Sequence, residues 1–271
     1  MRMTRARLRG AEPASRMMDL VYELARDTAS GELDKAGGAV LAFPGPFDYC
    51  AGISQMRHKL QSLYGVDLRQ GLAQRFNWSP RRFRFLNDAG AFLLGEVAAG
   101  AAEGAVRAVG IALGTGIGSA FALNGRWVKD GDGVPPSGEI WNLPYGAGMV
   151  EDLLSTRAIR QDYAQRTGKD KEVAAMAADA AADADARQVF ESFGVHLGQA
   201  LQAILAPFDP DVIVVGGGIA RSAGLFLPIA QQQLNGMKAR LVTASLGDEA
   251  PLVGATAFWQ SSQADQEISV A

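Results

Sequence analysis

Residues 109–118 read VGIALGTGIG, and this stretch decides how the rest of the chain is interpreted. The apolar residues up to Leu113 predict a strand, the glycines that follow predict a tight turn, and residues 119–123 predict a second strand. Asn124-Gly125 comes next and is a strong hairpin signal. A glycine turn lets backbone N–H groups approach a phosphate closely, although many such turns bind nothing.

A second glycine turn follows another apolar run. Residues 212–218 read VIVVGGG, which predicts a buried strand that ends in a turn and leads into a helix, whose N-terminus favours anions. Neither turn is a P-loop, because no Lys-Ser or Lys-Thr pair follows it. The first also lies between two strands, whereas a dinucleotide fingerprint opens a helix. A structural role and a phosphate-binding role stay open for both turns.

Predicted strands and helices alternate along the chain, which is typical of the α/β class. The strands are expected at residues 39–43, 82–86, 109–113, 119–123 and 212–215. The helices are expected at residues 14–33, 89–102, 150–167 and 190–205, and from about Gly254 onward.

Composition excludes several classes of function. The chain has 271 residues, 48% hydrophobic and 20% charged, with a net charge of −3, which suits a soluble protein of one large or two smaller domains. This balance gives no general attraction to nucleic acid or membranes. A single cysteine, Cys50, and two histidines, His58 and His196, argue against disulfides, cysteine zinc clusters and multi-histidine metal sites. We expect a cytoplasmic protein, since no apolar run is long enough to cross a membrane.

Asn87 and Asp88 lie where a predicted strand ends and a helix begins. Aspartate is a favoured N-cap, so a structural role is sufficient to explain Asp88. A carboxylate at the carboxyl end of a strand also faces the usual ligand crevice of an α/β sheet, where it could take a proton from a sugar hydroxyl. Capping and catalysis are equally good interpretations of these two residues alone.

Two further carboxylates invite the same question. Glu139 follows Gly138 in an irregular stretch, and Glu151 opens a predicted helix. A solvated loop carboxylate and a favourable charge at a helix N-terminus explain them without any ligand.

The motifs, taken in order, resemble the ROK family (repressors, open reading frames and sugar kinases). Each match is modest, and their shared order over most of residues 14–260 carries the resemblance. The matching segments are PGP at 44–46 with Asp48, LNDA at 86–89 with Glu96, GTGIG at 114–118 with Asn124-Gly125, GEI at 138–140, DP at 209–210 leading to GGGI at 216–219, LG at 246–247 and LVGA at 252–255.

The resemblance implies an α/β fold of the actin-like ATPase type, which is ribonuclease H-like and has two domains around a cleft. The small N-terminal domain is expected at residues 1–88, completed by the C-terminal helix 255–271, and the large domain at residues 89–254. Family members normally begin with a strand and an Asp-x-Gly-Gly-Thr loop, and no such motif precedes Ala14. We therefore expect the small domain to lack its first strands, with Met1 internal to a longer reading frame or the start of a short protein.

The resemblance also implies a glucokinase-like sugar kinase, which transfers the γ-phosphoryl group of ATP, with Mg²⁺, to a hexose hydroxyl, usually O6. By position, Asp88 resembles the general base. The residues that match sugar-binding positions are Gly45, Asn87, Glu139, Asn142 and Glu151. The residues that match ATP-binding positions are Gly114, Thr115, Gly116 and Gly118 around the phosphates, and Gly217 and Gly218 beside the adenosine.

Two departures from the family concern its sugar loop. No cysteine or histidine lies between Glu139 and Glu151, and Asn142 stands where the family has a metal-binding histidine. We therefore expect no structural zinc. Trp141 replaces a glycine, so the sugar pocket is expected to be reshaped, and glucose, fructose, mannose and N-acetylated hexosamines all stay open as substrates.

A second function stays open as well, that of a catalytically impaired sugar-binding or regulatory member of the family. The repressors of the family carry an N-terminal winged helix, for which this chain has no room. The expected partners are therefore a sugar and ATP, without nucleic acid or membrane. A homodimer is a further possibility, because dimers are common in the family.

Overall fold

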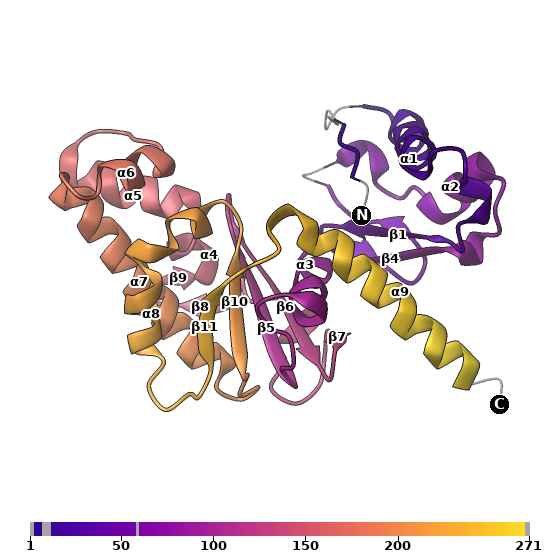
Figure 1. The fold of residues 1–271 in the computed structure, drawn as a ribbon. Coiled ribbons are helices and arrows are strands. Elements are labelled where there is room, and N and C mark those ends of the chain that lie inside the picture. Colours follow the sequence, from indigo (N-terminus) through magenta and orange to yellow (C-terminus); the bar gives the residue numbers. More distant parts are fainter. Residues whose placement is uncertain (1–2, 7–11, 58–59, 269–271) are drawn as a thin grey trace. The chain divides into compact units, whose positions relative to one another are not determined.

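The structure is a computed structural model that describes residues 3–6, 12–57 and 60–268 (Figure 1). The chain divides into two compact units, a smaller unit at Met1–Asp88 and a larger unit at Ala89–Ala271. The predicted division into domains, with residues 255–271 completing the smaller one, stays a prediction.

The smaller unit is built on two parallel strands, β1 (Ala39–Phe43) and β4 (Phe83–Asn87), paired in register from Ala39 with Phe83 to Phe43 with Asn87. Helices α1 (Ala14–Ala29) and α2 (Leu68–Phe76) pack against each other and share a core with the strands. The core is rich in aromatic rings, and Phe76 and Phe83 meet edge to face in it, with their ring centroids 5.2 Å apart. Short strands β2 (Phe47–Asp48) and β3 (Ile53–Ser54) form a separate antiparallel pair.

The larger unit is built on a five-stranded sheet in the order β11-β10-β5-β6-β7. Strands β5, β10 and β11 run parallel, and β6 and β7 are antiparallel to their neighbours. Their bounds are β5 (Arg107–Leu113), β6 (Ile117–Leu123), β7 (Arg126–Val128), β10 (Val212–Gly216) and β11 (Arg240–Thr243).

Helices cover both faces of this sheet, so its central strands are apolar throughout. In β10, Val212 and Val214 belong to the core cluster that contains Leu93 of α3 (Asp88–Ala99). Ile213 and Val215, between them, belong to the cluster that contains α7 (Ala184–Leu205). The alternation of successive side chains along one strand therefore supplies both cores.

Helix α9 (Ala250–Ile268) crosses α3 with its backbone close to that of α3. A Cβ built at Gly95 would lie 2.0 Å from the carbonyl oxygen of Ala250, and one built at Gly254 would lie 1.8 Å from that of Ala91. Glycine is required at both positions, because a larger residue would force the two helices apart. The fully buried carboxylate of Glu96 secures the same region, accepting hydrogen bonds from the backbone N–H groups of Ala101, Ser245 and Leu246.

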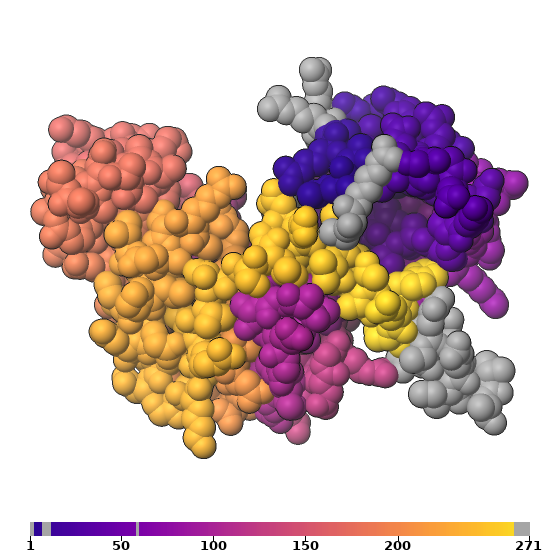
Figure 2. Space-filling view, viewed as in Figure 1, coloured from indigo at the N-terminus to yellow at the C-terminus, as the bar shows by residue number. Residues whose placement is uncertain are grey.

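The remaining elements are short. They are α4 (Val150–Leu153), α5 (Thr156–Thr167), α6 (Val173–Asp179), α8 (Leu227–Gln233), the antiparallel pair β8 (Pro144–Tyr145) and β9 (Gly148–Met149), and the 3₁₀ helices η1 (Leu33–Lys35), η2 (Gln61–Leu63), η3 (Pro80–Arg82), η4 (Pro136–Gly138), η5 (Ile219–Leu225) and η6 (Gly247–Glu249). Helices α5 and α6, salmon in Figure 2, protrude from the rest of the larger unit. None of the described helices is both long enough and apolar enough to cross a membrane.

Several predicted boundaries were wrong. The helix expected over residues 150–167 is two helices, because Leu154 leaves the helical conformation and Ser155 caps α5 by accepting a hydrogen bond from the N–H of Ala158. The helix expected after residues 216–218 begins as the 3₁₀ helix η5. The last helix begins at Ala250 rather than near Gly254, since Pro251 is tolerated in a first turn.

Candidate active site

The two glycine turns lie at the carboxyl ends of two neighbouring parallel strands of the large sheet. Strands β5 and β10 are parallel neighbours, with Ala112 opposite Gly216, and each turn begins where its strand ends. A Cβ built at Gly217 would be 2.2 Å from the carbonyl oxygen of Leu113, the last residue of β5. The carboxyl ends of parallel strands are where α/β sheets bind ligands.

The first turn is closed by a hydrogen bond from the N–H of Gly114 to the carbonyl oxygen of Gly116, at 2.9 Å. Thr156, at the start of α5, holds the outside of the turn, because both its N–H (2.9 Å) and its hydroxyl (2.8 Å) donate to the carbonyl of Gly114. Thr115 at the tip is exposed. This anchoring leaves the tip of the turn accessible to a ligand.

The carboxylate of Glu151 lies on this turn. Its Oε2 accepts a hydrogen bond from the N–H of Ile117 at 3.2 Å. A Cβ added to Gly116 would be only 2.0 Å from the same oxygen. The carboxylate therefore fits there because residue 116 has no side chain. Glu151, which matches a sugar-binding position, thus touches the turn that matches phosphate-binding positions.

The loop that carries Glu139 is attached to the same strand pair by Ser119. The hydroxyl of Ser119, in β6, donates to the carbonyl of Gly138 at 2.7 Å and accepts from the N–H of Ile140 at 3.1 Å, so it holds the backbone on both sides of Glu139. The indole N–H of Trp141 donates to Oε2 of Glu139 at 2.9 Å. These bonds orient the Glu139 carboxylate beside a partly exposed aromatic ring.

A hairpin joins Glu139 to Glu151. It is closed at its base by hydrogen bonds from the N–H of Glu151 to the carbonyl of Trp141 and from the N–H of Val150 to the carbonyl of Leu143, both at 3.0 Å. Asn142 is exposed in this loop. The hydroxyl of Tyr145, in β8, donates to Oε1 of Gln199 at 3.3 Å, and burial raises the pKa of this hydroxyl. The two backbone bonds hold the base of this loop together.

The predicted residues of the smaller unit lie at the ends of its two main strands. Asn87 ends β4, and its Nδ2 donates to the hydroxyl of Tyr49 at 3.0 Å, which in turn donates to the carbonyl of Phe43 at the end of β1. Gly45 is half-buried two residues after β1 and precedes a cis peptide bond to Pro46. The amide of Asn87 and the segment around Gly45 therefore belong to one local arrangement.

Asp88 is exposed and is the first residue of α3, directly after β4. The next residue along the chain, Ala89, is buried in the larger unit, and its Cβ would be 3.8 Å from a Cβ built at Gly118. Asp88 and Ala89 are joined by a peptide bond, so their Cα atoms are only about 3.8 Å apart. The covalent link therefore keeps the backbone of Asp88 close to that of Ala89.

Gly217 and Gly218 differ in their surroundings. Gly217 has a φ of +91° and is packed against the backbone of β5. Among the described residues, its own chain neighbours and nearby helix backbone apart, none comes within 4 Å of a Cβ built at Gly218. Gly217 is needed for the chain to turn, and Gly218 leaves open space beside that turn.

Two residues that hold this arrangement were not among the predicted ones. Ser119 and Thr156 attach the Glu139 loop and α5 to the glycine turn. The available signal for Ser119 was a hydroxyl inside an otherwise apolar strand, where an internal hydrogen-bond partner is expected. Thr156 offered no comparable signal, since Ser and Thr are common at the start of any helix.

Over residues 3–6, 12–57 and 60–268 the structure groups no three His, Cys, Asp or Glu side chains that could hold a metal ion. His196 packs edge to face on Tyr145, with ring centroids 6.1 Å apart, and His58 lies outside the described residues. The expectation of no structural zinc stays a prediction.

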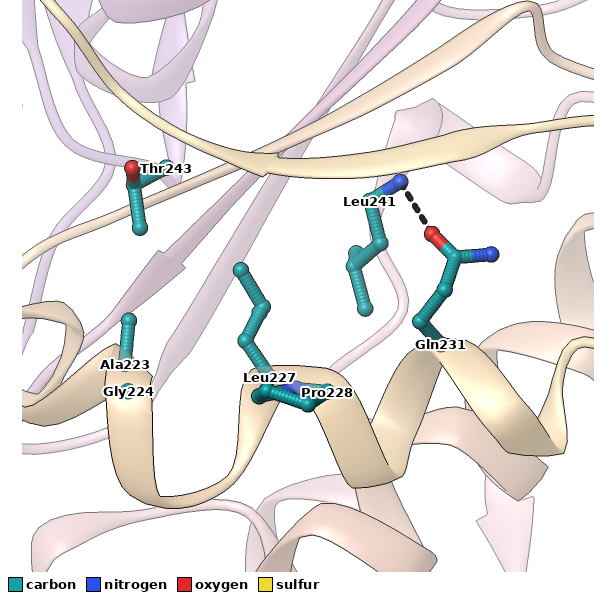
Figure 3. Close-up of a pocket in the computed structure, with 7 residues that line it drawn as sticks. All are labelled: Ala223, Gly224, Leu227, Pro228, Gln231, Leu241 and Thr243. Atoms are coloured by element: carbon teal, nitrogen blue, oxygen red, sulfur yellow. Dashed lines mark hydrogen bonds between the residues drawn. The ribbon is translucent and has the colours of Figure 1, made fainter.

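A separate hollow of roughly 370 Å³ lies at the β11 edge of the sheet (Figure 3). It is mostly apolar and is lined by residues of η5, α8 and β11, none of which is a predicted site residue. The side-chain amide of Gln231 crosses one end of it, accepting from the N–H of Leu241 at 2.7 Å and donating to the carbonyl of Ala239 at 3.2 Å. Figure 2 shows the gold segment that contains α8 on the visible face of the larger unit.

Fold and site together define an α/β protein with a candidate phosphate-binding edge, formed by two glycine turns with a carboxylate on one of them. The family can be stated more closely, because the model of the ROK family matches residues 9–262. The chain therefore belongs to the ROK family, and the resemblance noted in the sequence is confirmed.

The relatives of this chain include named sugar kinases. It is 27% identical over 248 residues to a glucokinase of Thermotoga maritima, a match that covers 79% of this chain and 76% of the relative. It is also 26% identical over 223 residues to an N-acetyl-D-glucosamine kinase of Pectobacterium carotovorum, covering 75% and 70%.

Solved structures of the family share the fold. The ROK hexokinase of Thermus thermophilus aligns with a TM-score of 0.77 at 24% identity, covering 91% of this chain and 86% of that one. The ROK glucokinase of Streptomyces griseus, solved with glucose and AMPPNP, aligns with a TM-score of 0.70 at 22% identity, covering 90% and 87%. The predicted class, an α/β fold of the actin-like ATPase type, is confirmed.

Proposed function

We propose that this protein is a sugar kinase that transfers the γ-phosphoryl group of ATP to a hexose hydroxyl, with O6 as the expected acceptor. The observation that supports the proposal most is the meeting of two glycine turns at the ends of neighbouring parallel strands, with Glu151 on one of them and the Glu139 loop attached beside it. The names of the relatives point to the same reaction.

In this proposal Asp88 is the general base. It accepts the proton of the sugar hydroxyl as that oxygen forms a bond to the γ-phosphorus, while the bond from the γ-phosphorus to the leaving oxygen of ADP breaks. Such a base contributes about 10²–10⁴-fold to the rate. Positioning and neutralisation of charge supply most of the remaining catalysis in phosphoryl transfer.

The residues that bind the sugar and the residues that bind ATP form two separate groups in this proposal. Carboxylates and amides suit hydroxyl groups, so we assign the sugar to Gly45, Asn87, Glu139, Asn142 and Glu151. We assign the ATP phosphates to Gly114, Thr115, Gly116 and Gly118, and the adenosine side to Gly217 and Gly218. Backbone N–H groups at such turns bind phosphate without a side chain in the way.

Mg²⁺ would arrive with the nucleotide as part of the substrate. Magnesium in kinases is held mainly by phosphate oxygens and water with one or two carboxylates, so it does not need a cage of protein ligands.

The test is the substitution Asp88→Asn. Asparagine caps a helix as well as aspartate does, so a capping role predicts unchanged stability and unchanged turnover. The proposed base predicts a loss of turnover of about 10²–10⁴-fold with sugar binding retained. A coupled assay of ADP release over a panel of hexoses gives the turnover and also identifies the sugar.

The exposed loop residue Asp132 supplies the matched control, because Asp132→Asn makes the same chemical change outside the proposed site. Full turnover in both variants would reject Asp88 as the base.

The second candidate is a sugar-binding or regulatory protein without catalysis. It is favoured by the structural likeness to a ROK transcriptional regulator, a homologue of the E. coli MLC protein, with a TM-score of 0.76 at 22% identity. Calorimetry separates the two candidates, since a sensor binds sugar without binding ATP and Mg²⁺.

A further inference from the structure

We infer that Glu151 couples the binding of nucleotide to the binding of sugar, because its carboxylate lies on the phosphate turn and is hydrogen-bonded to one of the backbone donors of that turn. This inference rests on the proposed kinase function and assigns to Glu151 a role in the nucleotide site as well as in the sugar site.

The first step is the position of the carboxylate. Oε2 of Glu151 accepts a hydrogen bond from the N–H of Ile117 at 3.2 Å and lies where a side chain at Gly116 would otherwise be. That N–H is one of the backbone donors that such a turn offers to a phosphate. The carboxylate therefore stands in for the anion that the turn would bind.

The second step is the charge. A nucleotide phosphate that reaches the turn meets a negatively charged group already hydrogen-bonded there, and like charges at close range disfavour each other. The carboxylate has to leave the turn before a phosphate can take the N–H of Ile117 as a donor. In the sugar-free protein, Glu151 thus lowers the affinity of the turn for nucleotide.

The third step is the alternative partner. The backbone of Glu151 is bonded to the carbonyl of Trp141, in the loop whose Glu139 we assign to the sugar. A hydroxyl of a bound sugar can donate a hydrogen bond to the carboxylate of Glu151 and so draw that carboxylate away from the N–H of Ile117. Sugar binding then exposes the turn, and by linkage nucleotide binding favours the sugar by the same factor.

The test measures the affinity for AMPPNP with Mg²⁺ by calorimetry, with and without saturating D-glucose or whichever hexose the panel identifies. In the unmodified protein we expect sugar to tighten nucleotide binding about tenfold, within the usual range of coupling between sites. In Glu151→Gln the charge is gone, so we expect nucleotide binding without sugar to tighten by a similar factor. The coupling in that variant should fall to within about twofold of unity.

The neighbouring carboxylate supplies the control. Asp152 accepts from the N–H of Met149 at 3.0 Å and pairs with Arg157 at 2.9 Å, so its bonds lie outside the turn. Asp152→Asn removes the same charge one residue away and should keep the full coupling. Glu151→Asp, which is one methylene shorter, keeps the charge but cannot reach Ile117, so it should tighten sugar-free nucleotide binding less than Glu151→Gln does.

The outcomes separate this inference from the function on which it rests. Sugar and nucleotide binding without any coupling, or coupling that persists in Glu151→Gln, overturns the inference and leaves the kinase proposal standing. Unmodified protein that binds no nucleotide overturns both. The sugar-free measurement needs no bound sugar, so it decides the matter even if Glu151→Gln weakens the sugar site.

Discussion

The two glycine turns of the large sheet look alike in sequence and differ in what surrounds them. At Gly116 the space that a side chain would fill is taken by the end of the Glu151 side chain, with its oxygen 2.0 Å from the position of a Cβ. At Gly217 it is taken by the backbone of Leu113, with the carbonyl oxygen 2.2 Å away, and φ is +91°. The obstacle at the first turn can move, and the obstacle at the second cannot.

This difference separates two reasons for a glycine. Gly217 is required by the fold, since the chain must turn in a left-handed conformation against a neighbouring strand. Gly116 is required by the side chain that lies against the turn, which is the carboxylate of Glu151. A run of glycines in a sequence therefore mixes structural and binding positions, and mutations can sort them.

The largest effect is expected for Gly217→Ala. Alanine is disfavoured at positive φ, and its methyl group would meet backbone that cannot yield without shifting β5. We expect the free energy of unfolding to fall by about 2–4 kcal/mol. Urea denaturation followed by circular dichroism measures this loss. A variant as stable as the unmodified protein would show that the two turns do not differ as described.

A smaller effect is expected for Gly116→Ala. Its methyl group has only to push aside the flexible end of Glu151, and the φ of residue 116 is not in the left-handed region. We expect the free energy of unfolding to fall by about 1 kcal/mol or less. The same denaturation experiment tests it, and a loss as large as that of Gly217→Ala would mean that the Glu151 carboxylate cannot move.

The smallest effect is expected for Gly218→Ala, which is adjacent to Gly217 and serves as its matched control. Gly218 has ordinary helical angles, with φ −63° and ψ −37°, and open space where the methyl group would lie. We expect a change within about 0.5 kcal/mol, since replacing glycine can also stabilise by restricting the unfolded chain. A marked shift in the denaturation midpoint would show that this space is not open.

Much of the large sheet could be predicted from local pattern. The apolar runs before each glycine turn predict strands because buried parallel strands are apolar on both faces, and β5, β6 and β10 lie where expected to within a few residues. The class of fold and the family were likewise predictable. The roles of Asp88 and of the sugar and ATP residues stay predictions, because they depend on ligands.

Other features depend on contacts that local pattern does not encode. Strand β11 was not predicted, since its four residues are too few for an alternating or apolar pattern to be recognised. The carboxylate of Glu151 on Ile117 joins residues 34 positions apart. The two hydrogen bonds between the Ser119 hydroxyl and the Glu139 loop join residues 19 and 21 positions apart. Such pairings are set by tertiary packing, and a single sequence carries no direct record of them.

The amide of Gln231 has a consequence for how this protein behaves at high concentration. The outer side of an outermost strand is a template on which further chains can add, and β11 is the outermost strand at one side of the five-stranded sheet. The side-chain amide of Gln231 forms hydrogen bonds with both Ala239 and Leu241, beside the hollow. This amide has the same donor and acceptor as a peptide group, so it takes the place there of an added strand. One glutamine thus protects this margin of the sheet against aggregation.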